Sequence, residues 1–77
     1  MSSAQPLHIH QENTRLRELL RQVEELCDLL DILWGSGKDQ NGFWCELWSN
    51  DTTTLYRGDS LPTVLHQAIG YLKDLLS

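Results

Sequence analysis

Residues 12–34 read ENTRLRELLRQVEELCDLLDILW, and this stretch decides the fold. Its apolar residues recur at alternating spacings of three and four, which is the pattern of the a and d positions of a heptad repeat. These heptad residues are Leu16, Leu19, Val23, Leu26, Leu30 and Leu33. The pattern predicts an amphipathic helix over about residues 12–34, which Asn13 or Thr14 caps and Gly35 ends.

A second apolar stripe, formed by Leu20, Cys27 and Trp34, adjoins the first on this helix. The chain has 77 residues, and a monomer of this size buries only about 60% of the surface that its unfolded chain exposes. A helix with two stripes can pack its own domain with one and a second copy with the other. We therefore expect a homodimer, with the six heptad residues at its interface.

The charges on the helix bear on how two copies would pair. Basic residues lie in its first half, and Glu24, Glu25, Asp28 and Asp31 lie in its second half, opposite to the preference of the helix macrodipole. An antiparallel pair would bring unlike halves together. Solvated surface charges explain the same pattern equally well, so the orientation of the pair stays open.

The residues after the helix predict a β-hairpin. Three glycines make residues 35–42 a flexible connector. Residues 43–49, FWCELWS, alternate between two faces, and residues 52–57 are rich in β-branched and aromatic types. Asn50 and Asp51 between them are typical turn residues, so the two segments should pair as antiparallel strands.

A second helix follows Gly58. Asp59 or Ser60 caps it and Pro62 lies in its first turn. Its apolar face consists of Leu61, Val64, Leu65, Ala68, Ile69, Leu72, Leu75 and Leu76. The predicted fold is thus α+β in the order α-β-β-α, with a polar arm over residues 1–11, a single domain over 12–77, and dimerisation through the long helix.

Composition and charge exclude several classes of protein. The formal net charge is -5, which argues against direct nucleic-acid binding, because that function needs a basic patch. No apolar run reaches the roughly 18 to 20 residues that span a bilayer, and residues 1–6 do not form a signal peptide. Cys27 and Cys45 show no metal or disulfide spacing. We expect a cytoplasmic protein with reduced thiols that binds no membrane.

The motifs that suggest chemistry are incomplete. Residues 35–38, GSGK, lack the first glycine and the final Ser or Thr of a phosphate-binding loop. His8 and His10 have no further ligands at a recognisable metal spacing. His66, with Cys45 and Asp59, has neither a nucleophile turn nor an oxyanion motif. We therefore expect no enzymatic activity, no cofactor and no metal site.

Three aromatic residues are the candidates for binding a partner. Trp44 and Trp48 share one face of the first predicted strand, with Tyr56 opposite them on the second. Tryptophan and tyrosine are enriched among binding hot spots, which favours an interaction surface. If helices cover both faces of the hairpin, the same rings are ordinary core, and the sequence leaves this alternative open.

These observations predict a small, cytoplasmic, non-enzymatic protein-protein interaction module: an adaptor, inhibitor or regulatory subunit. It should form a homodimer and bind an unidentified protein partner. Two alternatives remain. One is an acidic decoy of phage or host origin that covers a nucleic-acid-binding site, using the four acidic residues of the long helix. The other is a sensor of a small ligand bound in a dimer cleft.

Overall fold

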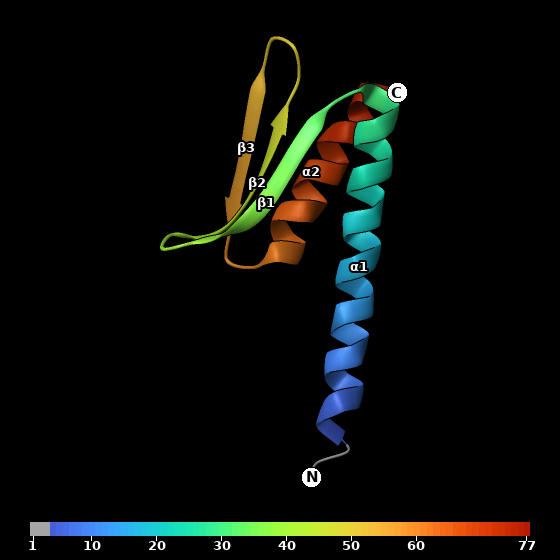
Figure 1. The fold of residues 1–77 in the computed structure, drawn as a ribbon, viewed down its shortest axis with the longest axis vertical. Helices are drawn as coiled ribbons and strands as arrows, with labels where there is room; N and C mark the ends of the chain where they lie inside the picture. Colours follow the sequence, from blue (N-terminus) through green and yellow to red (C-terminus); the bar gives the residue numbers. More distant parts are fainter. Residues whose placement is uncertain (1–3) are drawn as a thin grey trace.

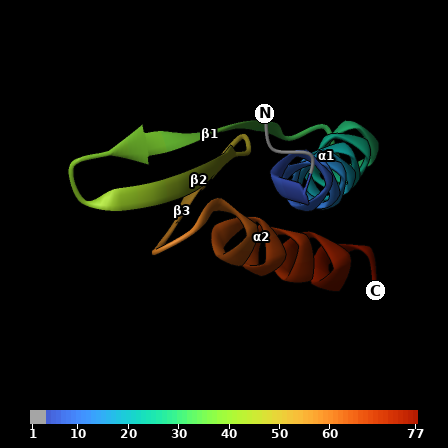
Figure 2. The same ribbon diagram turned by 90° about the horizontal axis from the view of Figure 1, so that it is seen from below.

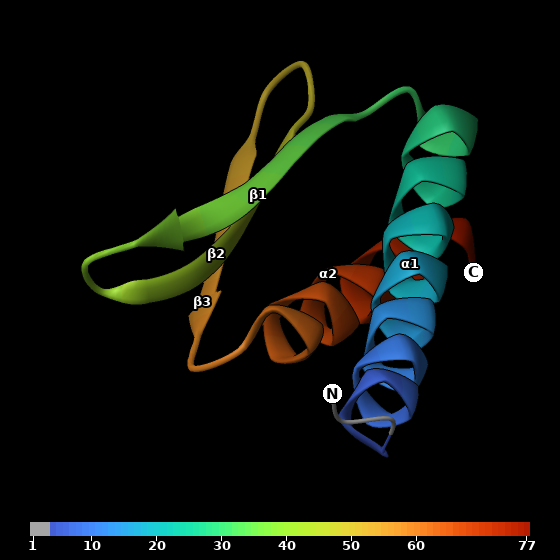
Figure 3. The ribbon, with the colours of Figure 1, turned by 60° about the horizontal axis from the view of Figure 1, so that its bottom comes forward.

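The computed structural model describes the backbone of residues 4–77 and the side chains of residues 14–77 (Figure 1). The elements are α1 (Ala4–Leu30), β1 (Leu33–Asp39), β2 (Gly42–Trp48), β3 (Thr53–Gly58) and α2 (Leu61–Leu76). The strands form one antiparallel sheet in the order β1-β2-β3. Both helices lie on the same side of this sheet, where α2 packs against β2 and β3 and α1 crosses α2 (Figures 2 and 3).

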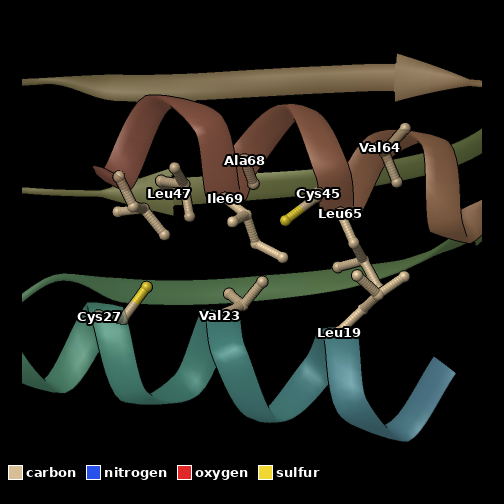
Figure 4. Close-up of a cluster of buried hydrophobic side chains, with 10 residues drawn as sticks. Leu19, Val23, Cys27, Cys45, Leu47, Val64, Leu65, Ala68 and Ile69 are labelled. Carbon is tan, nitrogen blue, oxygen red and sulfur yellow. The ribbon is translucent and has the colours of Figure 1, made fainter. Parts of the chain in front are cut away.

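The core lies between α1, α2 and the sheet face that they cover (Figure 4). Its buried members are Leu19, Val23, Cys27, Cys45, Leu47, Val64, Leu65, Ala68, Ile69 and Leu72. The predicted apolar face of the C-terminal helix supplies half of this set. Leu75 and Leu76 at the end of that face remain about half exposed.

The α+β class is confirmed, but the predicted two-stranded hairpin is wrong, because the sheet has a third strand. The residues interpreted as a flexible connector form most of β1, which pairs with β2 along its whole length. The glycines of β1 are the reason for the error, since glycine is depleted in strands. Here the indole ring of Trp44 takes the space that a side chain at Gly37 would fill: a Cβ there would lie 3.0 Å from its Cζ2.

The turn between β1 and β2 also carried a signal in the sequence. Asp39 pairs with Gly42, and the Asn41 backbone N–H donates a hydrogen bond of 2.9 Å to Oδ1 of Asp39. Gly42 has a φ of 117°, which favours glycine. Gln40 and Asn41 are the two turn residues, and a glycine with a positive φ directly after such a turn is typical of a hairpin.

Replacing Gly42 with alanine is expected to destabilise the protein by about 2 kcal/mol, because a strained backbone conformation costs about 1–3 kcal/mol. The new Cβ would also lie 2.8 Å from the carbonyl oxygen of Gly58. Chemical denaturation monitored by circular dichroism measures the loss in the free energy of unfolding. Gly70→Ala is the matched control: a Cβ there meets nothing within 4 Å, so we expect it to stabilise α2 by roughly 0.5–1 kcal/mol. Equal effects at the two sites would contradict the assigned turn.

The first helix has different ends from those predicted: α1 begins at Ala4, so it includes residues 4–11, and it ends at Leu30. Leu33 and Trp34 therefore belong to β1, not to the helix. The end is a Schellman motif, in which the N–H of Ile32 donates to the carbonyl oxygen of Cys27 at 2.9 Å and Asp31 has a φ of 58°. An aspartate in the left-handed region is uncommon, whereas Gly35 is an ordinary helix stop, so the sequence predicts the helix end four residues too late.

Asp31→Gly is expected to stabilise the protein by about 0.5–1 kcal/mol, since glycine adopts the left-handed conformation without a steric cost. In a domain of this size the melting temperature should rise by roughly 3–6 °C. Asp31→Asn is the control, because it removes only the carboxylate at the negative end of the helix. A melting temperature of Asp31→Gly no higher than that of Asp31→Asn would argue against the left-handed cap.

Candidate functional site

The sheet has one covered face and one face on which neither α1 nor α2 packs, and the strand register defines the second. Directly paired residues of antiparallel strands point to the same face. Cys45 and Leu47 point into the core, so the residues between them and their partners point away from it. We call this surface the open face; it consists of Leu33, Gly35 and Gly37 of β1, Trp44, Glu46 and Trp48 of β2, and Thr53, Leu55 and Arg57 of β3.

Two tryptophans occupy much of the open face, and the glycines of β1 make room for them. A Cβ added at Gly35 would lie 3.2 Å from Cη2 of Trp48 and 3.8 Å from Cζ3 of Trp44. Both rings therefore reach the space above Gly35. The prediction that Trp44 and Trp48 share a face is confirmed by the register.

Large apolar side chains on the open face remain in contact with solvent. The exposed fraction is 74% for Leu33, 48% for Leu55 and 37% for Trp48, whereas Trp44 is half-buried. Leu33 of β1 is the direct partner of Trp48 in the register, and Leu55 of β3 is the direct partner of Glu46. Apolar side chains grouped in this way, unlike singly scattered ones, are typical of surfaces that contact another molecule.

The charges of the open face lie at one corner and at the centre. Arg57 forms an ion pair with Asp39, with Nη1 3.1 Å from Oδ2. The Asn41 backbone N–H and then Arg57 hold the pKa of the Asp39 carboxyl below its usual range. Glu46 lies at the centre, and among residues 14–77 no basic side chain forms an ion pair with it.

Tyr56, the third predicted partner-binding residue, lies on the covered face of the sheet. It pairs with Cys45 in the register, and its ring centroid is 6.4 Å from that of Tyr71 in α2. Burial, followed by the neighbouring Tyr71, raises the pKa of its hydroxyl. Tyr56 thus packs between the sheet and α2 and does not belong to the open face.

The six predicted interface residues lie in three different surroundings. Leu19 and Val23 are buried in the core of the single chain, against α2. Leu16, Leu26 and Leu30 are partly buried beside that core, and Leu33 lies on the open face. Some of the heptad residues are therefore covered by α2 of the same chain. The homodimer itself stays a prediction.

The charges of α1 are partly paired within the helix. Arg21 forms ion pairs with Glu18 and Glu25, both at 2.5 Å. These pairs are exposed, so each contributes little to stability. A local pairing of this kind accounts for part of the charge pattern without a second helix.

The two cysteines are free thiols inside the core. Burial raises the pKa of each to about 11, and for Cys27 the neighbouring Cys45 and Asp28 add to the effect. Both thiols are therefore neutral at physiological pH, whereas a cysteine nucleophile needs a thiolate. Their positions indicate a packing role.

The candidate metal ligands and the candidate catalytic set are not brought together in the part of the chain that the structure describes. Residues 14–77 contain no group of three or more His, Cys, Asp or Glu side chains that could hold a metal. The side chains of His8 and His10 lie outside the described residues. A groove of about 570 Å³ between α1 and the start of α2 contains His66. Its other lining residues are Arg15, Leu16, Phe43, Ser60, Leu61 and Pro62, so Cys45 and Asp59 do not line it.

Comparison of the chain with family models, curated proteins and solved structures finds no significant match. Neither α1 nor α2, over residues 4–77, has the length and apolar character needed to cross a bilayer.

Proposed function

We propose that this protein is a small, non-enzymatic protein-protein interaction module, acting as an adaptor, inhibitor or regulatory subunit, and that it contacts its partner through the open face. One observation carries the proposal. The helices cover one side of a three-stranded sheet, and the other side presents the two tryptophans with the exposed Leu33 and Leu55. Partly exposed tryptophans beside apolar side chains are the composition of binding hot spots.

The support beneath the two tryptophan rings favours the same proposal. Its tryptophans lie on the central strand, which pairs with a neighbour on both sides. Their rings rest on the backbone of β1 at Gly35 and Gly37. A partner would therefore meet aromatic groups that are already ordered, and binding would cost little side-chain entropy.

The proposal places the protein in the cytoplasm. Cys27 and Cys45 are unpaired thiols, and reducing compartments keep cysteines in that state.

Affinity capture with matched variants tests the proposal. The tagged protein, a Trp48→Ser/Leu55→Ser variant and a Leu29→Ser variant are each used to capture proteins from a lysate of the source organism. Leu29 is 73% exposed on α1 and is absent from the open face, so it is the control. We expect the native chain and the control to retain the same protein. The amount retained by the double variant should be at least about tenfold lower, in line with the loss of two hot-spot residues.

Circular dichroism and thermal melting must show that all three chains fold equally. A partner that the double variant retains in full would refute the open face as the binding surface.

A further inference from the structure

Glu46 occupies the centre of the open face. It pairs with Gly35 on one side and Leu55 on the other, and Trp44 and Trp48 precede and follow it on the same face of β2. All four neighbours are apolar. Its side chain is half-buried, so this carboxylate stands within an apolar surface and not at its rim.

No cation of the described side chains pairs with this carboxylate. Arg57 on the open face is paired with Asp39. Lys38 belongs to the covered face, where its Nζ lies 5.4 Å from the centroid of the Phe43 ring. A purely apolar partner that covered the open face would bury Glu46 without a counter-charge, which is costly.

We propose that the open face binds a protein segment in which an arginine or lysine stands between apolar side chains, with the cation over Glu46. This inference rests on the proposed function. The carboxylate supplies the counter-charge, and the indoles of Trp44 and Trp48 attract a cation to their ring faces. Leu33 and Leu55 contact the apolar neighbours of that cation. The partner thus needs both features on one side of the segment, which in an extended chain means at alternate positions.

Two other occupants fit this chemistry less well. A second copy related by a two-fold axis through the centre of the face would place one Glu46 against the other, and like charges in an interface are repulsive. A nucleic acid would bring phosphates to a surface whose central charge is negative and whose arginine is already paired.

The test uses a capped peptide, acetyl-Leu-Ser-Arg-Ser-Leu-amide, whose arginine and leucines share one side of an extended chain, and its citrulline counterpart, which has the same shape without the charge. Each is titrated into the ¹⁵N-labelled protein while the three indole N–H signals are followed. We expect the arginine peptide to shift the signals of Trp44 and Trp48. Trp34 pairs with Leu47 and lies on the covered face, so its signal serves as an internal control.

The citrulline peptide should bind at least about fivefold more weakly than the arginine peptide, because it lacks the positive charge that pairs with the carboxylate of Glu46. Glu46→Gln should weaken binding of the arginine peptide by a similar factor and weaken binding of the citrulline peptide by less, since no charge pair is lost there. Equal binding of the two peptides, unchanged affinity in Glu46→Gln, or no shift at millimolar peptide would each overturn the inference. Signals of Trp44 and Trp48 that move on dilution without peptide would indicate a second copy and would overturn it as well.

Failure of this inference is distinguishable from failure of the proposed function. If the peptides show no preference for arginine but capture still depends on Trp48 and Leu55, the open face binds a partner by apolar contact alone. If capture does not depend on those residues, the proposed function fails whatever the peptides show.

Discussion

Leu19→Ala is expected to lower the free energy of unfolding by about 3 kcal/mol, within the range for removing a buried leucine side chain. Leu19 is 5% exposed and belongs to the cluster that joins α1 to α2 and the sheet. Removing its side chain leaves a cavity between elements that cannot collapse freely. In a domain of this size the melting temperature should fall by on the order of 15 °C. Urea denaturation measures the change.

The matched control is Leu29→Ala on the same helix. Leu29 is 73% exposed, so its truncation should change the free energy by less than about 0.5 kcal/mol. A similar loss at both positions would show that α1 is covered on its outer side, as it would be in a dimer.

The dependence of stability on protein concentration also distinguishes packing of the heptad residues within one chain from packing between two copies. If Leu19 packs against α2 of its own chain, the loss of stability is the same at protein concentrations of about 1 µM and about 100 µM. If the heptad residues joined two copies, the midpoint of the transition would rise with concentration, because association stabilises the folded state by mass action. A concentration-dependent midpoint in the native chain that disappears in Leu19→Ala would contradict the packing described above.

The heptad pattern shows what periodicity can and cannot predict. The spacing of Leu19 and Val23 identified the apolar side of α1, and both residues are buried. Periodicity says that a stripe needs cover, but not which element provides it. Here α2 covers part of the stripe, although it lies far away in the sequence. The C-terminal helix was easier to predict, because Ser60 caps it by accepting a hydrogen bond from the N–H of Thr63.

The missed strand has a tertiary cause. Gly35 and Gly37 lower the intrinsic strand preference of β1, and the strand becomes favourable only when Trp44 and Trp48 pack over them. Those tryptophans belong to the next strand, so the intrinsic preferences of the β1 residues alone do not reveal the interaction. The local signal of the hairpin was Gly42, which has a positive φ directly after the turn residues Gln40 and Asn41.

The candidate site was predicted in part. Alternation along β2 placed Trp44 and Trp48 together, because a strand has a side-chain period of two. Tyr56 was misplaced because its face depends on the register of β3, and a shift of one residue reverses the face. The turn sets that register through the N–H of Ser49, which donates to the carbonyl oxygen of Thr52 at 2.9 Å. The sequence alone does not indicate a role for Glu46, because that role depends on the apolar neighbours that β1 and β3 place beside it.

Raising the pH above about 9 is expected to destabilise the protein steeply. The ordinary thiol pKa is about 9.0, and burial raises the pKa of both Cys27 and Cys45 to about 11. The unfolded chain therefore loses these protons first as the pH rises, and the folded state binds more protons between the two values. Stability contributed by the neutral thiols is fully present below pH 9 and is lost up to about pH 11. Each thiol contributes a slope on the order of 1.4 kcal/mol per pH unit in this range.

Urea denaturation at a series of pH values measures this slope, and single-cysteine variants assign it. Cys27→Ala and Cys45→Ala should each lower stability at pH 7, because both side chains are buried. Each should also remove about half of the cysteine-dependent slope above pH 9, since one titrating thiol remains. The slope is therefore separable from the packing loss, which does not depend on pH. A native chain whose stability stays constant to pH 11 would mean that the thiols titrate in the folded protein as they do in the unfolded chain, and hence that water reaches the core between α1 and the sheet.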